Sequence, residues 1–141
     1  MSEITNQDIM RTVIEEAFNK ENYAVLERLF AGDYKENQFG LKPTVEGMKK
    51  DIHYLHMVFP DFHVEIEDMV SDGDFVWARS TGRGTDLGGF MGKATGKKIE
   101  ITVMDVVRIE NGRIVEHWGA PDRFAALSQL GLLHVPQGTS V

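Results

Sequence analysis

The segment EHWGAPD, residues 116–122, places three ionisable side chains around a tryptophan, just ahead of an amphipathic pattern. Glu116, His117 and Asp122 are of the types that transfer protons near neutral pH when their surroundings shift the pKa. The alternative is a solvated strand end, whose charges only keep the chain in solution. The elements that position these side chains decide between the two interpretations.

A β-hairpin is predicted to carry most of this segment. The residues on either side of the dipeptide Asn-Gly alternate in polarity, and that dipeptide is typical of a two-residue type I′ turn. Counting outward from the turn pairs Asp105 with Trp118. Because side chains alternate between the two faces of a strand, this register places Asp105, Glu116 and Trp118 on one mostly apolar face. It places His117 on the opposite face, which favours a sheet-surface or subunit-contact role.

Two carboxylates on an apolar face are the unusual feature of this prediction. A carboxyl group among aliphatic and aromatic side chains has its charged form disfavoured, so its pKa should rise. Asp105 or Glu116 could then stay protonated and donate a hydrogen bond, or act as a general acid or base. The alternative is an ion pair, for example of Glu116 with Arg79 or Arg108, that holds the sheet in register.

Length and composition limit the possible protein classes. A chain of 141 residues fits one domain, residues 1–141, and 42% hydrophobic with 26% charged residues is typical of a globular protein. The absence of cysteine excludes disulfides, thiolate nucleophiles and cysteine metal sites. A formal net charge of −7 argues against binding to nucleic acid or to an anionic membrane. Without a signal-peptide pattern or an apolar run near the roughly 18 residues of a membrane span, a cytoplasmic protein is expected.

The spacing of apolar residues predicts a helical first half and a strand-rich second half. Helices are predicted over residues 9–18, 23–30, 44–59 (with Thr44 as N-cap) and 121–130, and strands over 63–70, 75–84, 99–109 and 113–118. The glycine-rich residues 84–96 are expected to form a loop or lid, and residues 134–141 a disordered tail. Helices followed by an antiparallel sheet predict an α+β fold with the helices on one face of the sheet.

A curved sheet that folds over a helix leaves a conical cavity, where small molecules bind. His56, beside the apolar stripe of the third helix, could serve there as an acid or base, or lie at the rim without chemistry. Asn37 and Gln38 could orient a carbonyl or hydroxyl group of a ligand, or form only a polar turn. Tyr34 could donate a hydrogen bond or merely pack. The histidines lack convincing metal-ligand spacing, so no metal is expected.

A resemblance to a known family extends from about residue 9 to residue 133. The SnoaL-like polyketide cyclase family is similar in the segments PDFHVEIEDMVSDGDFVWARSTGRGT, GKATGKKIEITVMDVVRIENGRIVEHW and DRFAALSQLGLL. It belongs to the nuclear-transport-factor-2-like superfamily, together with ketosteroid isomerase and scytalone dehydratase. The resemblance implies a cone-shaped α+β fold, with a curved antiparallel or mixed sheet wrapped around N-terminal helices and a ligand cavity.

The resemblance also implies a reaction. SnoaL-type cyclases close a ring of a polyketide ester by intramolecular aldol condensation, with neither a metal nor an organic cofactor. An aspartate after the last strand removes the proton that creates the enolate, and the matching residue of the W-x-x-x-D pattern is Asp122. Asp122 could equally begin the last helix, because a carboxylate there interacts favourably with the helix dipole. The two roles are compatible.

Ketosteroid isomerase differs from this sequence at the residues that transfer protons. That enzyme uses a protonated aspartate in its oxyanion hole, and the matching position resembles Asp105. Its general base and its oxyanion tyrosine fall at Gln38 and near Ile14, neither of which transfers a proton. The resemblance implies a hydrogen-bonding role for Asp105 and argues against steroid isomerisation.

Three functions are compatible with these observations. The first is a cofactor-independent cyclase, isomerase or dehydratase for a small hydrophobic carbonyl compound, with Asp122 as base and Asp105 as donor to the oxyanion. Its substrate-contacting residues are expected to be Tyr34, Asn37, Gln38, His56, Glu116 and Trp118. The second is a non-catalytic binding module with the same cavity. The third is an epoxide-hydrolase-like protein, which needs an arginine, Arg79 or Arg108, beside Asp105.

A homodimer is expected through the outer face of the sheet. Trp77, Arg79 and Thr81 alternate along one predicted strand and would share a face. Tryptophan and arginine are enriched in protein interfaces. No nucleic-acid or membrane partner is expected, because the chain is acidic.

Overall fold

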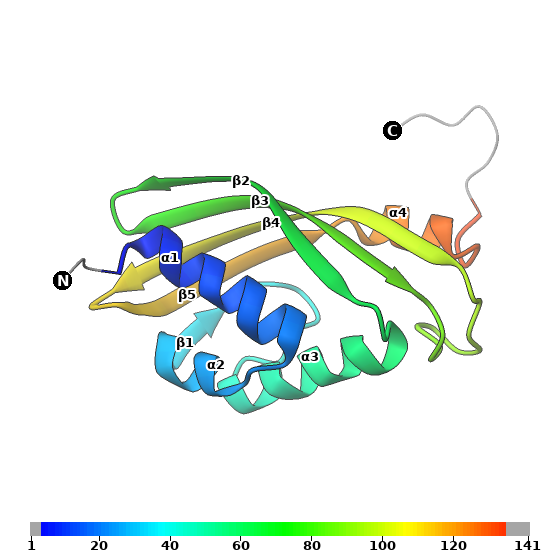
Figure 1. The fold of residues 1–141 in the computed structure, drawn as a ribbon, viewed down its shortest axis with the longest axis horizontal. Coiled ribbons are helices and arrows are strands. Elements are labelled where there is room, and N and C mark those ends of the chain that lie inside the picture. The colour runs from blue at the N-terminus through cyan, green and yellow to red at the C-terminus, as the bar shows by residue number, and fades with distance from the viewer. Residues whose placement is uncertain (1–3, 135–141) are drawn as a thin grey trace.

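A curved sheet of five strands forms one layer of the protein (Figure 1). This computed structural model describes residues 4–134, so residues 135–141 of the predicted tail lie outside the described residues. The strands are β1 (Phe30–Glu36), β2 (His63–Asp72), β3 (Phe75–Thr85), β4 (Lys98–Glu110) and β5 (Arg113–Pro121), in the spatial order β1-β5-β4-β3-β2. β1 runs parallel to β5, and the other neighbouring strands are antiparallel. The predicted α+β architecture is confirmed.

The helices before and between the strands lie against one face of the sheet, and the last helix follows β5 at the far end (Figure 1). They are α1 (Asn6–Thr12), the π-helical turn η1 (Val13–Phe18), α2 (Ala24–Leu29), α3 (Val45–Val58) and α4 (Arg123–Gln129). Thr44 caps α3 as predicted, because its hydroxyl accepts a hydrogen bond from Gly47 N at 2.9 Å. In the part of the chain that the structure describes, no helix is long and apolar enough to cross a membrane.

The core lies between the concave face of the sheet and these helices. Leu26 of α2 and Ile52 of α3 are fully buried against Val76 of β3 and Ile114 of β5. A smaller buried cluster joins the end of α3 to α4. Side chains on the concave face therefore either belong to the core or line the space that the core leaves open.

Strand β1 was not predicted, because the second helix was expected to continue to Phe30. The helix ends at Leu29, and Phe30 begins the strand. Phe30 and Tyr34 are both buried, and their rings pack edge to face with centroids 4.8 Å apart. Pairing with β5, which is distant in sequence, supplies the backbone hydrogen bonds, and local periodicity carries no signal of such a partner.

A β-bulge in β5 changes the register of the last hairpin. Ile109 lies opposite Ile114, as predicted, but Arg108 lies opposite Glu116, so Val115 is an extra residue in β5. Every later residue of β5 is therefore shifted by one position relative to the prediction. A shift of one residue moves each side chain to the other face of the sheet.

The bulge reverses the predicted faces. Asp105 lies opposite Gly119 and not opposite Trp118. The prediction that His117 faces away from Asp105 is wrong, because both residues line the cavity on the concave side. The prediction that Glu116 and Trp118 share the face of Asp105 is wrong for the same reason, since the shift carries both to the convex side.

The glycine-rich segment is a loop folded around one buried carboxylate. Asp86 is fully buried. It accepts hydrogen bonds from the backbone N–H groups of Gly89, Phe90 and Thr95 and from the Thr95 hydroxyl, at 2.9–3.2 Å. Gly96 N also donates to the Asp86 carbonyl oxygen at 2.8 Å. These contacts fix the shape of the loop, which the sequence left open.

Candidate active site

A cavity of about 710 Å³ opens between the concave face of the sheet, the helices and the glycine-rich loop. Most of its walls are apolar, as at Ile14, Val64 and Val107. Its acidic and basic lining residues are Glu36, Lys42, Asp51, Asp105, His117 and Arg123. Because such groups act at a reduced dielectric constant among apolar walls, their mutual contacts decide which of them carry protons.

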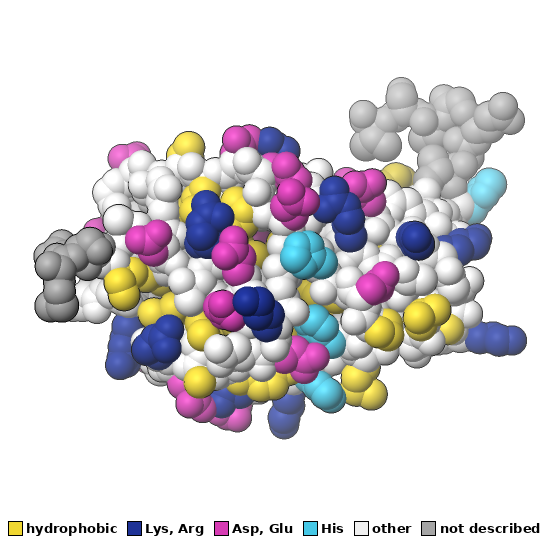
Figure 2. Space-filling view, in the orientation of Figure 1, with side chains coloured by type: hydrophobic (Ala, Val, Ile, Leu, Met, Phe, Trp, Pro, Cys, Tyr) yellow, Lys and Arg dark blue, Asp and Glu magenta, His cyan; other side chains and the backbone are white. Residues whose placement is uncertain are grey.

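Exposed apolar side chains border the cavity. Figure 2 shows hydrophobic side chains near the end of α3 and the glycine-rich loop, on a face where acidic and basic side chains are otherwise intermixed. Tyr54 of α3 and Met91 of the loop line the cavity and are 49% and 67% exposed. The Tyr54 hydroxyl donates to the Phe90 carbonyl oxygen at 3.0 Å and so ties α3 to the loop. An apolar compound would meet a compatible surface here before entering.

His117 lies between two carboxylates inside this cavity. Its Nδ1 is 2.5 Å from Glu36 Oε2, and its Nε2 is 2.8 Å from Asp105 Oδ1. The three residues come from β1, β5 and β4, which are neighbours in the sheet in that order. Strand pairing therefore fixes the geometry of this group, the Glu36–His117–Asp105 triad.

Glu36 is the most enclosed member of the triad, with 1% of its side chain exposed. Besides the bond to His117, it accepts hydrogen bonds from the Tyr34 hydroxyl at 3.2 Å and from Gln38 N at 3.0 Å. A buried carboxylate is stable when such donors surround it. Glu36 was not predicted as a site residue. The period-two spacing of Tyr34 and Glu36 would have indicated it if β1 had been recognised as a strand.

The pKa of His117 is raised to about 9. Burial alone would lower this pKa, but the hydrogen bonds and charges of Asp105 and Glu36 outweigh burial. At neutral pH both ring nitrogens carry protons, so His117 donates to both carboxylates. Two carboxylates and one imidazolium leave the triad with one net negative charge.

Asp105 lines the cavity and uses only one of its two carboxylate oxygens in hydrogen bonds with the described part of the chain. Its Oδ1 is bonded to His117, whereas its Oδ2 has no hydrogen-bond partner within residues 4–134. Its side chain is 18% exposed, and its neighbours Val103 and Val107 on the same face of β4 also line the cavity. A carboxylate oxygen held in this way can accept a proton from a bound molecule.

Asp122, the other predicted catalytic carboxylate, lies at the surface. Its side chain caps α4 and accepts a hydrogen bond from Ala125 N at 3.0 Å. The residue is exposed and does not line the cavity. The expectation that Asp105 and Asp122 share one apolar cavity is wrong, and the helix-start interpretation of Asp122 is confirmed.

Glu116 forms an ion pair with Arg108. This is the interpretation that the sequence offered as the alternative to a raised pKa of Glu116. Arg108 donates to its Oε1 from Nε and Nη2, both at 3.3 Å, and the Asn37 amide donates to its Oε2 at 3.0 Å. The hydrogen bonds from Asn37 and Arg108 lower the pKa of Glu116. Trp118, on the same face, packs against Phe75 with ring centroids 6.1 Å apart.

Of the other predicted ligand contacts, Gln38 lines the cavity, whereas Tyr34, Asn37 and His56 do not. His56 is bonded within the protein, because its Nε2 lies 2.6 Å from the Phe18 carbonyl oxygen. Tyr34 reaches the site only through its bond to Glu36. Asn37 is exposed and supports β5 from the rim.

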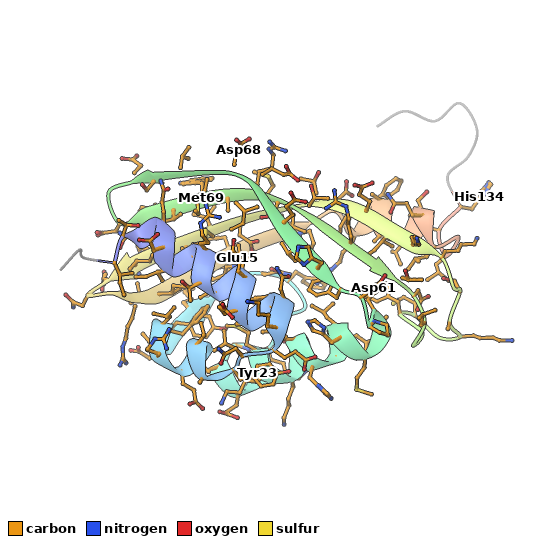
Figure 3. All side chains as sticks on the ribbon, in the orientation of Figure 1. Glu15, Tyr23, Asp61, Asp68, Met69 and His134 are labelled. Carbon is orange, nitrogen blue, oxygen red and sulfur yellow. The ribbon has the colours of Figure 1, made fainter. Side chains whose placement is uncertain are left out.

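The arginines of the epoxide-hydrolase hypothesis lie outside the cavity. Arg79 is bonded to Asp68, which projects from β2 away from the helices (Figure 3). Arg108 is bonded to Glu116 on the same convex side. This placement removes the sequence feature that supported the third function.

Comparison with protein families agrees with this architecture. The family model for SnoaL-like polyketide cyclase matches residues 8–130. The chain belongs to the SnoaL-like polyketide cyclase family. The sequence resemblance to SnoaL-like proteins is thereby confirmed over almost its whole extent. Comparison with curated protein sequences gives no match.

Solved structures of several Streptomyces proteins resemble this SnoaL-like chain. IdmH from Streptomyces antibioticus, a candidate polyketide cyclase, is 33% identical with a TM-score of 0.81, and the match covers 90% of this chain and 99% of that one. TsrD from Streptomyces laurentii is 25% identical with a TM-score of 0.83, covering 94% and 99%. AclR from Streptomyces galilaeus, a candidate hydroxylase, is 24% identical with a TM-score of 0.81, covering 94% and 89%, and shares the fold. Because one fold accommodates proteins of different ascribed reactions, the reaction has to be argued from the site.

Proposed function

We propose that this SnoaL-like protein catalyses an intramolecular aldol reaction of a hydrophobic carbonyl compound, with Asp105 as the base. The observation that carries this proposal is the free Oδ2 of Asp105 in an apolar cavity, opposite an Oδ1 held by protonated His117. Membership of a polyketide cyclase family supports the reaction class.

The proposed reaction begins when Asp105 Oδ2 accepts a proton from a carbon atom next to a carbonyl group of the substrate. The electrons of the broken C–H bond form an enolate, whose carbon attacks a second carbonyl carbon of the same molecule. A carbon–carbon bond forms, and the attacked oxygen becomes an alkoxide. The alkoxide takes the proton back from Asp105, so the cyclic product is an isomer of the substrate and the carboxylate is restored.

His117 stabilises the anion formed in this reaction. When Asp105 becomes protonated, its negative charge passes to the enolate in surroundings of low dielectric constant. The His117 imidazolium stays beside the reacting atoms. Its attraction to the Asp105 carboxylate is lost when Asp105 is protonated, and its attraction to the negatively charged enolate replaces it. Glu36 acts through His117 as a positioning residue, because its carboxylate fixes the ring and its charge.

Substitution of the two aspartates separates the possible bases. Asp105→Asn keeps the size of the side chain but cannot accept the proton, so the rate should fall at least about 100-fold, the usual scale for a general base. Asp122→Asn keeps the helix cap, because asparagine caps as well as aspartate, and should retain the rate. Ring closure of linear poly-β-carbonyl compounds, supplied both as methyl esters and as the corresponding carboxylates, is followed by the absorbance of the cyclic product and measures both.

The assignment of the base to Asp122, implied by the family resemblance, stays a prediction that the same assay tests. A rate lost in Asp122→Asn and kept in Asp105→Asn would contradict the proposal and return the base role to Asp122. Exchange of the α-protons of cyclohexanone in deuterium oxide, followed by NMR, extends the assay beyond ring closure. A wild-type protein that binds ketones without exchanging these protons would be a binding module.

The homodimer also remains a proposal, and exposed apolar side chains on the convex face of the sheet support it. Val70, Trp77 and Met104 are 61%, 50% and 43% exposed on the adjacent strands β2, β3 and β4. Val70 and Trp77 are direct cross-strand partners. Size-exclusion chromatography with light scattering should give twice the monomer mass, and Trp77→Asp should give the monomer mass. A wild-type monomer at micromolar concentration would contradict the dimer.

A further inference from the structure

Arg123 differs from the other cations of the cavity wall, because no acidic side chain of the described residues balances it. Lys42 donates to Asp51 from both its backbone N–H and its Nζ, each at 3.0 Å. His117 is balanced by the carboxylates of the triad. Within residues 4–134, no salt bridge or hydrogen bond joins the Arg123 guanidinium to a carboxylate. One positive charge on the cavity wall is therefore left without a partner from the described chain.

The Arg123 side chain reaches across the rim to the segment that follows β1. A Cβ atom on Gly40 would lie 3.1 Å from Arg123 Nη1, so the guanidinium lies against the backbone there. Gly40 has a φ of +89°, a conformation that side-chain-bearing residues rarely adopt. This contact places the positive charge of Arg123 beside Gly40, which follows Gln38 by two residues in the sequence.

Gln38 supplies a second polar group without a partner. Its backbone N–H is bonded to Glu36, but its side-chain amide has no hydrogen bond within the described ranges. The amide lies over β5, because a Cβ atom on Gly119 would be 2.0 Å from Gln38 Oε1. Since Gly119 is the cross-strand partner of Asp105, the amide stands between the rim and the triad.

We infer that Arg123, together with the Gln38 amide, binds a carboxylate of the substrate at the mouth of the cavity. This inference rests on the proposed function and narrows the substrate class to oxo acids. A guanidinium binds a carboxylate through two parallel hydrogen bonds, whereas Lys42 is already neutralised by Asp51. The apolar walls of the cavity contact the hydrocarbon part of the substrate. The position of the bound carboxylate determines which C–H group of the substrate reaches Asp105.

Binding of octanoate and of its neutral analogue octanamide tests the subsite without requiring turnover. Isothermal titration at pH 7 should show about tenfold weaker octanoate binding by Arg123→Gln, the scale of a charge-assisted hydrogen bond. Octanamide binding should change less than about twofold, because the neutral ligand has no charge to lose. Arg123→Lys should regain part of the octanoate affinity, since it restores the charge but not the planar fork.

Arg113→Gln is the matched control, because Arg113 is exposed in the hairpin and does not line the cavity. It should leave both affinities unchanged. Equal losses for both ligands in Arg123→Gln, unchanged octanoate affinity, or no binding of octanoate by the wild type would each overturn the inference.

Asp105→Asn distinguishes failure of the subsite from failure of the proposed function. It should bind octanoate at least as tightly as the wild type does, because Arg123 is kept and a carboxylate that repels an anion is removed from the same cavity. If Asp105→Asn loses turnover while Arg123→Gln shows no selective loss of octanoate affinity, the proposed reaction stands and the carboxylate subsite is wrong. If Arg123→Gln loses affinity for octanoate but not for octanamide while Asp105→Asn keeps turnover, the carboxylate subsite stands and the assignment of Asp105 as the base is wrong.

Discussion

His117 of β5 is hydrogen-bonded through Nε2 to Asp105 of β4 at 2.8 Å, although a regular hairpin would place them on opposite faces of the sheet. The extra residue Val115 makes this contact possible. The same bulge carries Glu116 out of the cavity to Arg108. A face predicted to hold two carboxylates thereby holds a carboxylate paired with an imidazolium, and a partly buried charge needs such a partner.

Loss of the proton of His117 should make the protein less stable in alkaline solution. Its pKa is about 9 in the folded protein, against an ordinary value of 6.5. A raised folded-state pKa contributes stability that is fully present below about pH 6.5 and is lost as the pH rises through about 9. The free energy of unfolding, from urea denaturation, should fall by up to about 3 kcal/mol over that window.

The variant His117→Gln is the control for this pH dependence, because it lacks the titrating group. Its free energy of unfolding should be lower than that of the wild type near pH 6 and should vary less toward alkaline pH. The same alkaline decrease in both proteins would show that another group is responsible.

Substitution of Glu36 should change the pKa of His117. Glu36→Gln replaces a carboxylate that raises this pKa by a neutral amide, so the pKa should fall. NMR titration of the imidazole ring protons measures the change directly. Asp33→Asn, an exposed change on the same strand, should leave the pKa of His117 in place. An unaltered pKa in Glu36→Gln would refute the positioning role of Glu36.

A methyl group at Gly119 should disturb the site more than the fold. The Cβ of Gly119→Ala would lie 2.0 Å from Gln38 Oε1 and 2.9 Å from His117 Cε1, so both side chains must move. Overpacking of this kind costs about 1–3 kcal/mol, and the rate of ring closure should fall as well. Gly32→Ala is the matched control, because no atom of the described residues lies within 4 Å of its added Cβ. Equal rates in the two variants would exclude a role for this contact.

Asp86→Asn should loosen the glycine-rich loop and with it one wall of the cavity. The substitution removes the charge and presents an amide to backbone donors, which should lower the free energy of unfolding by about 2–3 kcal/mol. Burial raises the pKa of Asp86, but hydrogen bonds from Thr95, Gly89 and Phe90 outweigh burial and hold it below its usual value. This contribution is present above about pH 3.8 and is lost as the pH falls through the lower folded-state value.

Urea denaturation and limited proteolysis within residues 86–97 measure the effect of this substitution. Asp72→Asn, an exposed change at the end of β2, should leave both unchanged. A loop that resists protease equally in Asp86→Asn and in the wild type would contradict the role of Asp86.

Local sequence signals predicted the parts of the fold that depend on local interactions. Thr44 caps its helix, the Asn-Gly dipeptide forms its turn with Asn111 at a φ of +52°, and the family segments indicated the architecture. Strand β1 could not be predicted from its own residues, because its strand partner within residues 4–134 is β5, which lies far along the sequence. Nothing in the local pattern distinguishes a helix that ends at Leu29 from one that continues.

The candidate site was predictable only in part, because one inserted residue decides its composition. Asp105 was expected on the concave face and lies there, whereas His117 and Glu116 exchange places through the bulge. The sequence did contain an indication of the bulge. Two unpaired carboxylates on one apolar face would be unfavourable, and the bulge moves Glu116 to the other face of the sheet. Asp122 could not be resolved from sequence, because a helix cap and a catalytic base favour the same residue type.

The Glu36–His117 contact joins residues that are 81 positions apart. On a ribosome, the strand bearing Glu36 emerges long before β5, its strand partner among the described residues, so the Glu36–His117–Asp105 triad is among the last parts of the molecule to be assembled. Long-range pairing of this kind is slow to form. During refolding from urea, recovery of turnover should therefore lag behind recovery of helical circular dichroism.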